Sequence, residues 1–275
     1  QTDENNMLGK SITGYQMWFG QDHYHNWFNW RPNKLDMEMW PDISDYPESS
    51  LHPSNFDNYG DGREAKLFNS YDPAVIDLHM SWMKEYGIDG AAIQRFYAYT
   101  NTLKDQKSDY MLPVIEAAEK HGRLYYLMYD MSGSGNVSPA AVIERIQLDF
   151  INNIEGKGFV SSPNYAHAEG KPVVCLWGLA DASTNYPNAY VARELISWFK
   201  DRGYYVIMGT PDNQFASRTS DYAEAYAMAD MISPWTVGRY SNLNGVRSTY
   251  FNSIKNDLAY CEARGIEYLP VMFAG

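Results

Sequence analysis

Short apolar runs rich in β-branched and aromatic residues alternate with amphipathic helical patterns along the chain, and this alternation constrains the fold more than any other feature. Seven runs are predicted strands, at residues 12–18, 90–94, 124–128, 172–177, 204–208, 230–233 and 267–273. Six predicted helices separate them, at residues 72–86, 108–120, 138–153, 189–201, 218–227 and 244–264. Because a helix between two strands normally forms a right-handed parallel crossover, the alternation predicts a parallel sheet of the α/β class.

The predicted helices carry recognisable ends. Asp72 is placed to cap the first helix, and Pro73 suits its first turn, where no backbone N–H is needed. Ser138 occupies the same capping position before the third helix. Glycines follow four of the helices, at Gly87, Gly122, Gly203 and Gly265.

Seven strands in this rhythm favour a barrel over an open sheet. The chain has 275 residues, and a (β/α)8 barrel takes about 250. An open doubly wound sheet would usually show a glycine-rich phosphate fingerprint, which Gly133, Gly135 and Ser138 match poorly. We therefore predict a single domain over residues 1–275, a (β/α)8 TIM barrel that is C-terminally incomplete. A long aromatic-rich loop at about 19–70 would be functional, since its aromatic content argues against disorder.

Composition excludes several classes of function. Acidic residues outnumber basic ones 34 to 22, so a nucleic acid partner is not expected. No apolar run is long enough for a membrane span. The two cysteines, Cys175 and Cys261, are too few for a disulfide framework and are predicted to be buried thiols. The 8 Trp, 23 Tyr and 11 Phe would either stack on sugar rings or pack in the core.

In a barrel of this kind the active site lies at the carboxyl ends of the strands. Acids, amides, arginines and aromatic residues follow the predicted strand ends, which suits a neutral ligand with many hydroxyl groups. Asp130 is the candidate catalytic acid, the alternative being an aspartate that caps the turn. The candidate substrate-binding residues are Trp18, Asp22, His23, Gln94, Arg95, Tyr97, Trp177, Asp212, Asn213, Trp235 and Arg239. Three acids near strand starts, Asp89, Asp230 and Glu267, are predicted to stabilise the fold instead.

Metal and serine chemistry find less support in the sequence. His23 and His25 could hold a metal, although no later histidine follows a strand end to complete the site. Residues 57–62 (DNYGDG) begin like a calcium loop, but Phe68 stands at the twelfth position, where a glutamate is needed. There is no G-x-S-x-G motif, so a serine esterase is not expected.

Several stretches resemble glycoside hydrolase families 71 and 99, in order and over nearly the whole chain. They are GYQMWFG and HNW in residues 14–27, residues 70–96, YYLMYDMSG in residues 125–133, residues 162–178, residues 229–240 and residues 265–275. The resemblance implies a secreted, periplasmic or cell-surface enzyme that is endo-acting on α-linked glycans. It implies α-mannosides cleaved with retention for family 99, α-1,3-glucan for family 71, and an oligo- or polysaccharide as the binding partner. No metal or organic cofactor is implied for family 99 catalysis.

One departure from the families bears on catalysis. Glycoside hydrolysis generally needs two carboxyl groups, and the family 99 glutamates lie around strand 8, whereas the sequence ends at Gly275 after the seventh predicted strand. We therefore carry over no catalytic glutamate, and expect a truncated chain whose Gln1 follows a removed leader or tag. A glycoside hydrolase is the first hypothesis, a non-catalytic carbohydrate-binding barrel the second, and a metal-dependent hydrolase at His23 and His25 the third.

Overall fold

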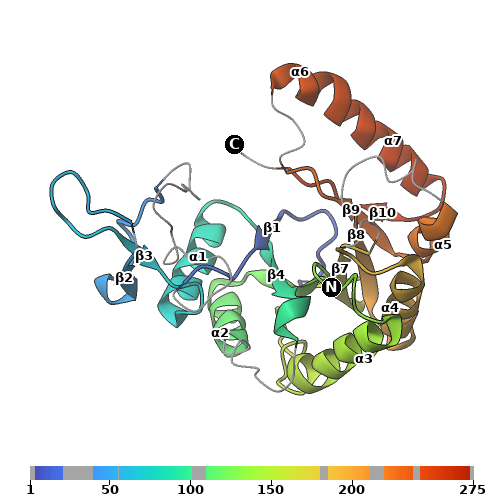
Figure 1. The fold of residues 1–275 in the computed structure, drawn as a ribbon, viewed down its shortest axis with the longest axis horizontal. Helices are drawn as coiled ribbons and strands as arrows, with labels where there is room; N and C mark the ends of the chain where they lie inside the picture. The colour runs from blue at the N-terminus through green and yellow to red at the C-terminus, as the bar shows by residue number, and fades with distance from the viewer. Residues whose placement is uncertain are drawn as a thin grey trace.

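A curled, mostly parallel sheet forms the centre of the molecule (Figure 1). The computed structural model describes residues 4–20, 40–54, 56–100, 110–179, 185–210, 220–237 and 242–272. Its parallel strands follow the chain in the order β1 (Ile12–Tyr15), β4 (Gly90–Phe96), β5 (Leu124–Asp130), β7 (Lys171–Trp177), β8 (Tyr205–Thr210), β9 (Met231–Pro234) and β10 (Glu267–Tyr268). The predicted α/β fold is confirmed: seven parallel strands alternate with helices as a half-barrel.

Helices cover the outside of the curled sheet (Figure 1). They are α1 (Pro73–Glu85), α2 (Met111–His121), α3 (Pro139–Asp149), α4 (Ala189–Asp201), α5 (Ser220–Met228), the short α6 (Leu243–Gly245) and α7 (Phe251–Glu262). π-Helical segments extend α3 over Phe150–Glu155 and precede α7 over Val246–Tyr250. The predicted cap of α1 is confirmed, since the Asp72 carboxylate accepts a hydrogen bond from the Ala74 N–H at 2.9 Å.

The hydrophobic core fills the space between the sheet and these helices and continues onto the inner face of the sheet. Side chains alternate between the two faces of a strand, and those that face the helices are apolar along most of the sheet. Ile93, Leu127 and Leu176 from three neighbouring strands are fully buried, in one cluster with Ile146 of α3 and Leu195 of α4. Cys175 and Cys261 are free and buried, as the sequence predicts.

Three short strands were not predicted, because two or three residues are too few to show a period. β2 (Leu51–Pro53) and β3 (Lys66–Phe68) form an antiparallel pair inside the segment predicted as a long loop. β6 (His167–Ala168) pairs antiparallel with β7. Strand ends also differ: β1 stops at Tyr15, β4 continues to Phe96, and β10 covers only the first two residues of the predicted strand.

Candidate functional site

One line of strand pairing crosses the carboxyl end of the sheet. Phe96 of β4 pairs with Asp130 of β5, Asp130 with Trp177 of β7, Trp177 with Gly209 of β8, and Gly209 with Ser233 of β9. Paired residues of parallel strands face the same side of the sheet, so these five residues, here called the register line, share one face. Tyr129, next to Asp130, contacts α3. The register line therefore lies on the inner face, away from the helices.

Asp130 is the carboxylate of the register line and is 7% exposed. Its Oδ2 accepts a hydrogen bond from the Gln94 side-chain amide at 2.7 Å. Its Oδ1 accepts from the Ser132 N–H at 2.9 Å and from the Ser132 hydroxyl at 2.5 Å. An ionised carboxylate accepts hydrogen bonds and donates none, so three donors suit Asp130 as an anion that orients a partner group.

The charge of Asp130 also affects the pKa of a thiol on the neighbouring strand β7. Cys175 of β7 lies two residues before Trp177 and faces the same side. Burial, and next the charge of Asp130, raise the pKa of the Cys175 thiol. The thiol therefore stays protonated, and Cys175 is a packing residue beneath the site.

A second hydroxyl group extends the contacts of Asp130. Ser132 gives its single hydroxyl proton to Asp130, and the Tyr186 hydroxyl lies 3.4 Å from the Ser132 oxygen. Tyr186 is held there because the backbone N–H of Gly133 donates to the carbonyl oxygen of Asn185 at 2.9 Å. Ser132 and Tyr186 were not predicted from the sequence. A serine two residues after an aspartate is a turn signal that could have found the first.

Aromatic rings border the carboxylate on one side. Trp177 and Trp235 meet edge to face with ring centroids 5.5 Å apart, and the ring centroid of Tyr186 lies 6.4 Å from that of Trp177. Two glycines make room for these rings. A Cβ atom on Gly209 would lie 2.2 Å from Cδ1 of Trp177, and one on Gly178 would lie 2.5 Å from Cδ1 of Tyr186.

A stacked aromatic pair borders the other side. Trp18 stacks on Phe96 with centroids 5.0 Å apart and planes 11° from parallel. Phe96 lies beside Asp130 on the register line. The structure thus brings together five residues that were proposed for the site from the sequence: Trp18, Gln94, Asp130, Trp177 and Trp235.

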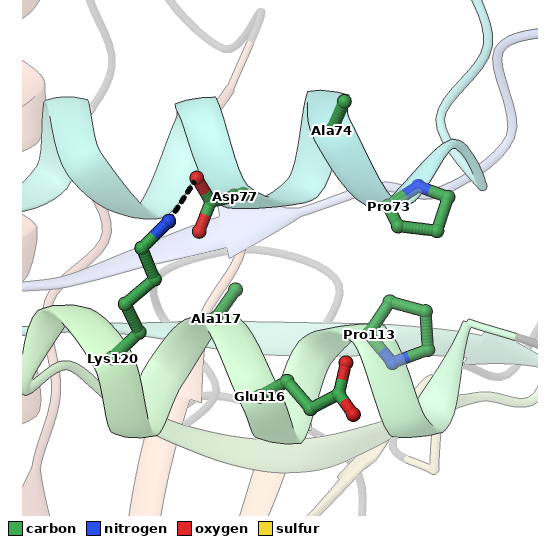
Figure 2. A pocket seen from close by; sticks show the side chains of 7 residues that line it. All are labelled: Pro73, Ala74, Asp77, Pro113, Glu116, Ala117 and Lys120. Carbon is green, nitrogen blue, oxygen red and sulfur yellow. Dashed lines mark hydrogen bonds and ion pairs between the residues drawn. The ribbon is translucent and has the colours of Figure 1, made fainter.

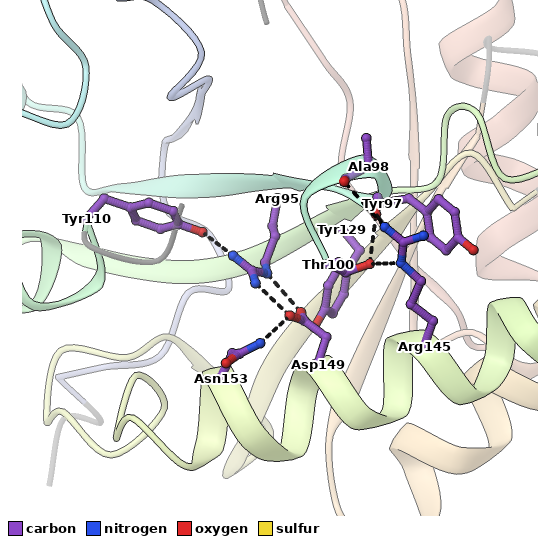
Figure 3. A network of polar contacts seen from close by, with 9 residues as sticks. All are labelled: Arg95, Tyr97, Ala98, Thr100, Tyr110, Tyr129, Arg145, Asp149 and Asn153. Atoms are coloured by element: carbon purple, nitrogen blue, oxygen red, sulfur yellow. Dashed lines mark hydrogen bonds and ion pairs between the residues drawn. The ribbon is translucent and has the colours of Figure 1, made fainter. Parts of the chain in front are cut away.

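Two other proposed residues are placed elsewhere (Figure 3). Arg95 is 1% exposed, and its guanidinium pairs with Asp149 of α3, on the helix side of the sheet. Tyr97 is buried, with the guanidinium carbon of Arg145 4.2 Å from its ring centroid. Arg95 was expected to bind substrate because the predicted strand ended one residue before it. In β4 it is instead an outer-face strand residue.

Five proposed residues lie outside the described ranges: Asp22, His23, Asp212, Asn213 and Arg239. His25, weighed above as a metal ligand, lies there too. Within the described ranges, no group of three or more His, Cys, Asp or Glu side chains is arranged to hold a metal ion. No helix of that part of the chain has the length and apolar character to cross a membrane.

Aspartates at the amino ends of the strands have the structural role that the sequence predicts. Asp89 accepts a hydrogen bond from the Ser11 N–H at 2.8 Å. Asp230 accepts from the Val206 N–H and from Lys200 of α4, both at 2.8 Å. These contacts join neighbouring segments at the end of the sheet opposite to Asp130.

A cavity of about 390 Å³ lies apart from the register line, between α1 and α2 (Figure 2). Asp77 of α1 and Lys120 of α2 face each other across it at 2.8 Å. Prolines and alanines from the two helices form most of its remaining lining. The cavity is on the helix side of the sheet, so we do not assign it to the candidate site.

Two solved structures of a family 99 (GH99) endo-α-mannosidase from Bacteroides thetaiotaomicron are similar to this chain. One, in complex with bis-tris-propane, has a TM-score of 0.54 at 16% sequence identity and covers 95% of this chain and 68% of its own. The other has a TM-score of 0.53 at 16% identity and covers 94% of this chain and 70% of its own. No family model and no curated protein matches the sequence. The likeness shows the fold alone, a barrel similar to that of the endo-α-mannosidase.

Proposed function

We propose that this barrel is an endo-acting glycoside hydrolase that cleaves α-linked glycans of the α-mannan or α-glucan type. The observation that carries the proposal is Asp130, held by Gln94 and Ser132 between two groups of aromatic rings at the carboxyl end of the strands. Barrel enzymes place their chemistry at this end. A secreted, periplasmic or cell-surface location, where polysaccharides are met, is part of the proposal.

The composition of the site suits a sugar ligand. Half-buried aromatic rings offer flat apolar faces, and a few convergent polar groups fix orientation, as in most small-molecule sites. We assign Trp177, Trp235 and Trp18 to the walls of the cleft, and Gln94 to a sugar hydroxyl. Asp130, which already accepts three hydrogen bonds, would accept one more from a sugar hydroxyl or from the attacking water.

The proposal is tested by the variants Asp130→Asn and Trp235→Ala against α-mannan and α-glucan oligosaccharides. Loss of the carboxylate is expected to lower kcat/KM by about 100-fold or more. Loss of the indole is expected to weaken binding by about 1 kcal/mol or more, seen mainly in KM. Hydrolysis and binding that stayed unchanged in both variants would show that the site is elsewhere.

A second candidate function is a barrel that binds a glycan without cleaving it. One observation favours it: Asp130 is the one carboxylate among the five residues of the register line, whereas hydrolysis generally needs two carboxyl groups. Calorimetry with an oligosaccharide, followed by product analysis over days, separates the two functions. Affinity without product supports binding alone, and product supports the hydrolase.

A further inference from the structure

A buried polar network lies directly behind the candidate site, on the helix side of the sheet (Figure 3). At its centre is Asp149, the last residue of α3, which is completely buried. The Arg95 guanidinium donates to both carboxylate oxygens, from Nε at 2.8 Å and from Nη2 at 2.6 Å. A bidentate pair of this kind fixes the relative orientation of its partners as well as their distance.

The same carboxylate accepts two further hydrogen bonds. The Tyr129 hydroxyl donates at 2.7 Å, and the side-chain amide of Asn153 donates at 2.8 Å. Burial, and next the charge of Asp149, raise the pKa of Tyr129, so its hydroxyl remains a donor. Burial alone would lower the pKa of Arg95, but the charges of Tyr110 and of the hydrogen-bonded Asp149 outweigh it and raise that pKa.

The strand neighbours of these two donors form the candidate site. Arg95 stands between Gln94 and Phe96, and Tyr129 directly precedes Asp130. Consecutive strand residues point to opposite faces, so the bonds from Arg95 and Tyr129 to α3 lie behind the Gln94–Asp130 bond. Gln94 and Asp130 are each one residue away along the backbone from Arg95 and Tyr129. A displacement of Arg95 or Tyr129 therefore also moves Gln94 or Asp130.

The network is confined to the level of the site. Ile93 and Leu127, the preceding outer-facing residues of β4 and β5, are fully buried and apolar. Leu176, which pairs with Tyr129 on the next strand, is also apolar. A buried ion pair is often no more stabilising than apolar residues of similar volume. Its placement at the level of Gln94 and Asp130 therefore points to a role in the geometry of the site, in addition to stability.

We propose that Asp149 is a positioning residue for the candidate site. By holding Arg95 and Tyr129 from the helix side, it sets the separation of the Gln94 amide from the Asp130 carboxylate and directs that carboxylate into the cleft. The part of this inference that concerns glycan turnover rests on the proposed function. The part that concerns the Gln94–Asp130 bond does not need a substrate.

The test compares Asp149→Asn and Tyr129→Phe with the matched control Asp230→Asn. Asp230 also joins a helix to the sheet, through Lys200 of α4 and the Val206 N–H, but at the amino ends of the strands. The first readout is the NMR signal of the Gln94 side-chain amide, assigned with Gln94→Leu. In Asp149→Asn and Tyr129→Phe its hydrogen-bonded proton should shift towards the value of a free amide. In Asp230→Asn it should not move, even where the melting temperature falls.

The second readout is steady-state kinetics on the glycan that the wild-type chain cleaves. Misplacement of a catalytic group by about 1 Å can cost about 100-fold in rate. We therefore expect kcat to fall by about 10- to 100-fold in Asp149→Asn, with a smaller change in KM. The Asp230→Asn variant should keep the kcat of the wild-type protein.

Each outcome decides the proposal. An unchanged Gln94 amide signal in folded Asp149→Asn and Tyr129→Phe would overturn it. If Asp149→Asn does not fold, Tyr129→Phe decides alone, since it keeps the Arg95–Asp149 pair and removes one hydrogen bond. If the wild-type chain neither binds nor cleaves any glycan, the proposed function fails. The amide signal still shows whether Asp149 positions the inner pair.

Discussion

Gly209 determines where the indole of Trp177 lies. A Cβ atom at this position would be 2.2 Å from Cδ1 of Trp177, so the ring must move in Gly209→Ala. Such overpacking typically costs about 1–3 kcal/mol. We expect Gly209→Ala to shift the tryptophan fluorescence and to weaken glycan binding by about tenfold.

Gly14→Ala is the matched control for this substitution. Gly14 also lies in a strand of the sheet, yet a Cβ atom there would meet nothing within 4 Å. Its variant should keep the fluorescence and the affinity of the wild-type protein. Equal effects of the two alanines would mean that Trp177 is not held by Gly209.

His79 of α1 gives the stability of the chain a pH dependence. Its ring nitrogens lie 2.8 Å from the Tyr15 hydroxyl and 2.7 Å from the Tyr46 hydroxyl. Burial lowers the pKa of His79 to about 4, against about 6.5 in an unfolded chain. Because the folded pKa is the lower one, the stabilisation is complete above about pH 6.5 and is lost as the pH falls towards 4.

We expect urea titrations to show this loss. Between pH 7 and pH 4.5 the wild-type protein should lose on the order of 2 kcal/mol more unfolding free energy than His79→Gln, which cannot titrate at this position. The variant will be less stable at neutral pH, so the comparison concerns the slopes of the two pH profiles. Parallel profiles would show that His79 does not titrate on unfolding.

The end of β4 explains why Arg95 was placed wrongly in space from the sequence alone. The prediction ended this strand at residue 94, which would leave Arg95 in a loop at the barrel mouth, whereas β4 continues to Phe96. A shift of one residue exchanges the two faces of a strand. Gln94, Asp130 and Trp177 face the inner side wherever the strand ends, so the same error does not move them to the helix side. Their roles in the site stay predictions.

The positions of the main elements followed from local signals. α4 was predicted with its observed bounds, Ala189–Asp201, because an amphipathic pattern precedes Gly203. The structure adds that the side chain of Asn188 caps this helix. The β2–β3 pair, by contrast, depends on contacts between residues 51–53 and 66–68 that no local period records. Tyr186 is placed at the site by tertiary contacts, among them those of Asn185 with Gly133 and of Tyr186 with Ser132.

The cap of α1 offers a test at the scale of one element. Asp72→Ala removes the acceptor of the Ala74 N–H and should cost about 1 kcal/mol of unfolding free energy, measured in urea. Asp72→Asn keeps a side-chain oxygen at the cap and should cost much less. Equal losses in the two variants would mean that the charge of Asp72, rather than its hydrogen bond, stabilises the start of α1.

The charge of the whole molecule leads to a prediction about ligand class. The chain carries a formal net charge of −12 at pH 7. A neutral glycan has no long-range attraction or repulsion to be screened. We therefore expect its dissociation constant to change less than twofold between about 50 and about 500 mM NaCl. A steep salt dependence would indicate a charged ligand and would contradict the neutral glycan.

The register line also spaces its five residues regularly across the inner face of the sheet. Neighbouring strands of a sheet lie about 4.8 Å apart, so the line from Phe96 to Ser233 places one residue at about this interval on every strand it crosses. A linear ligand bound along the line would contact β4, β5, β7, β8 and β9 in turn. Its length would set how many of these strands it contacts. Each position along such a ligand would therefore correspond to one strand. A substitution at one residue of the register line would change the contact at one position of the ligand.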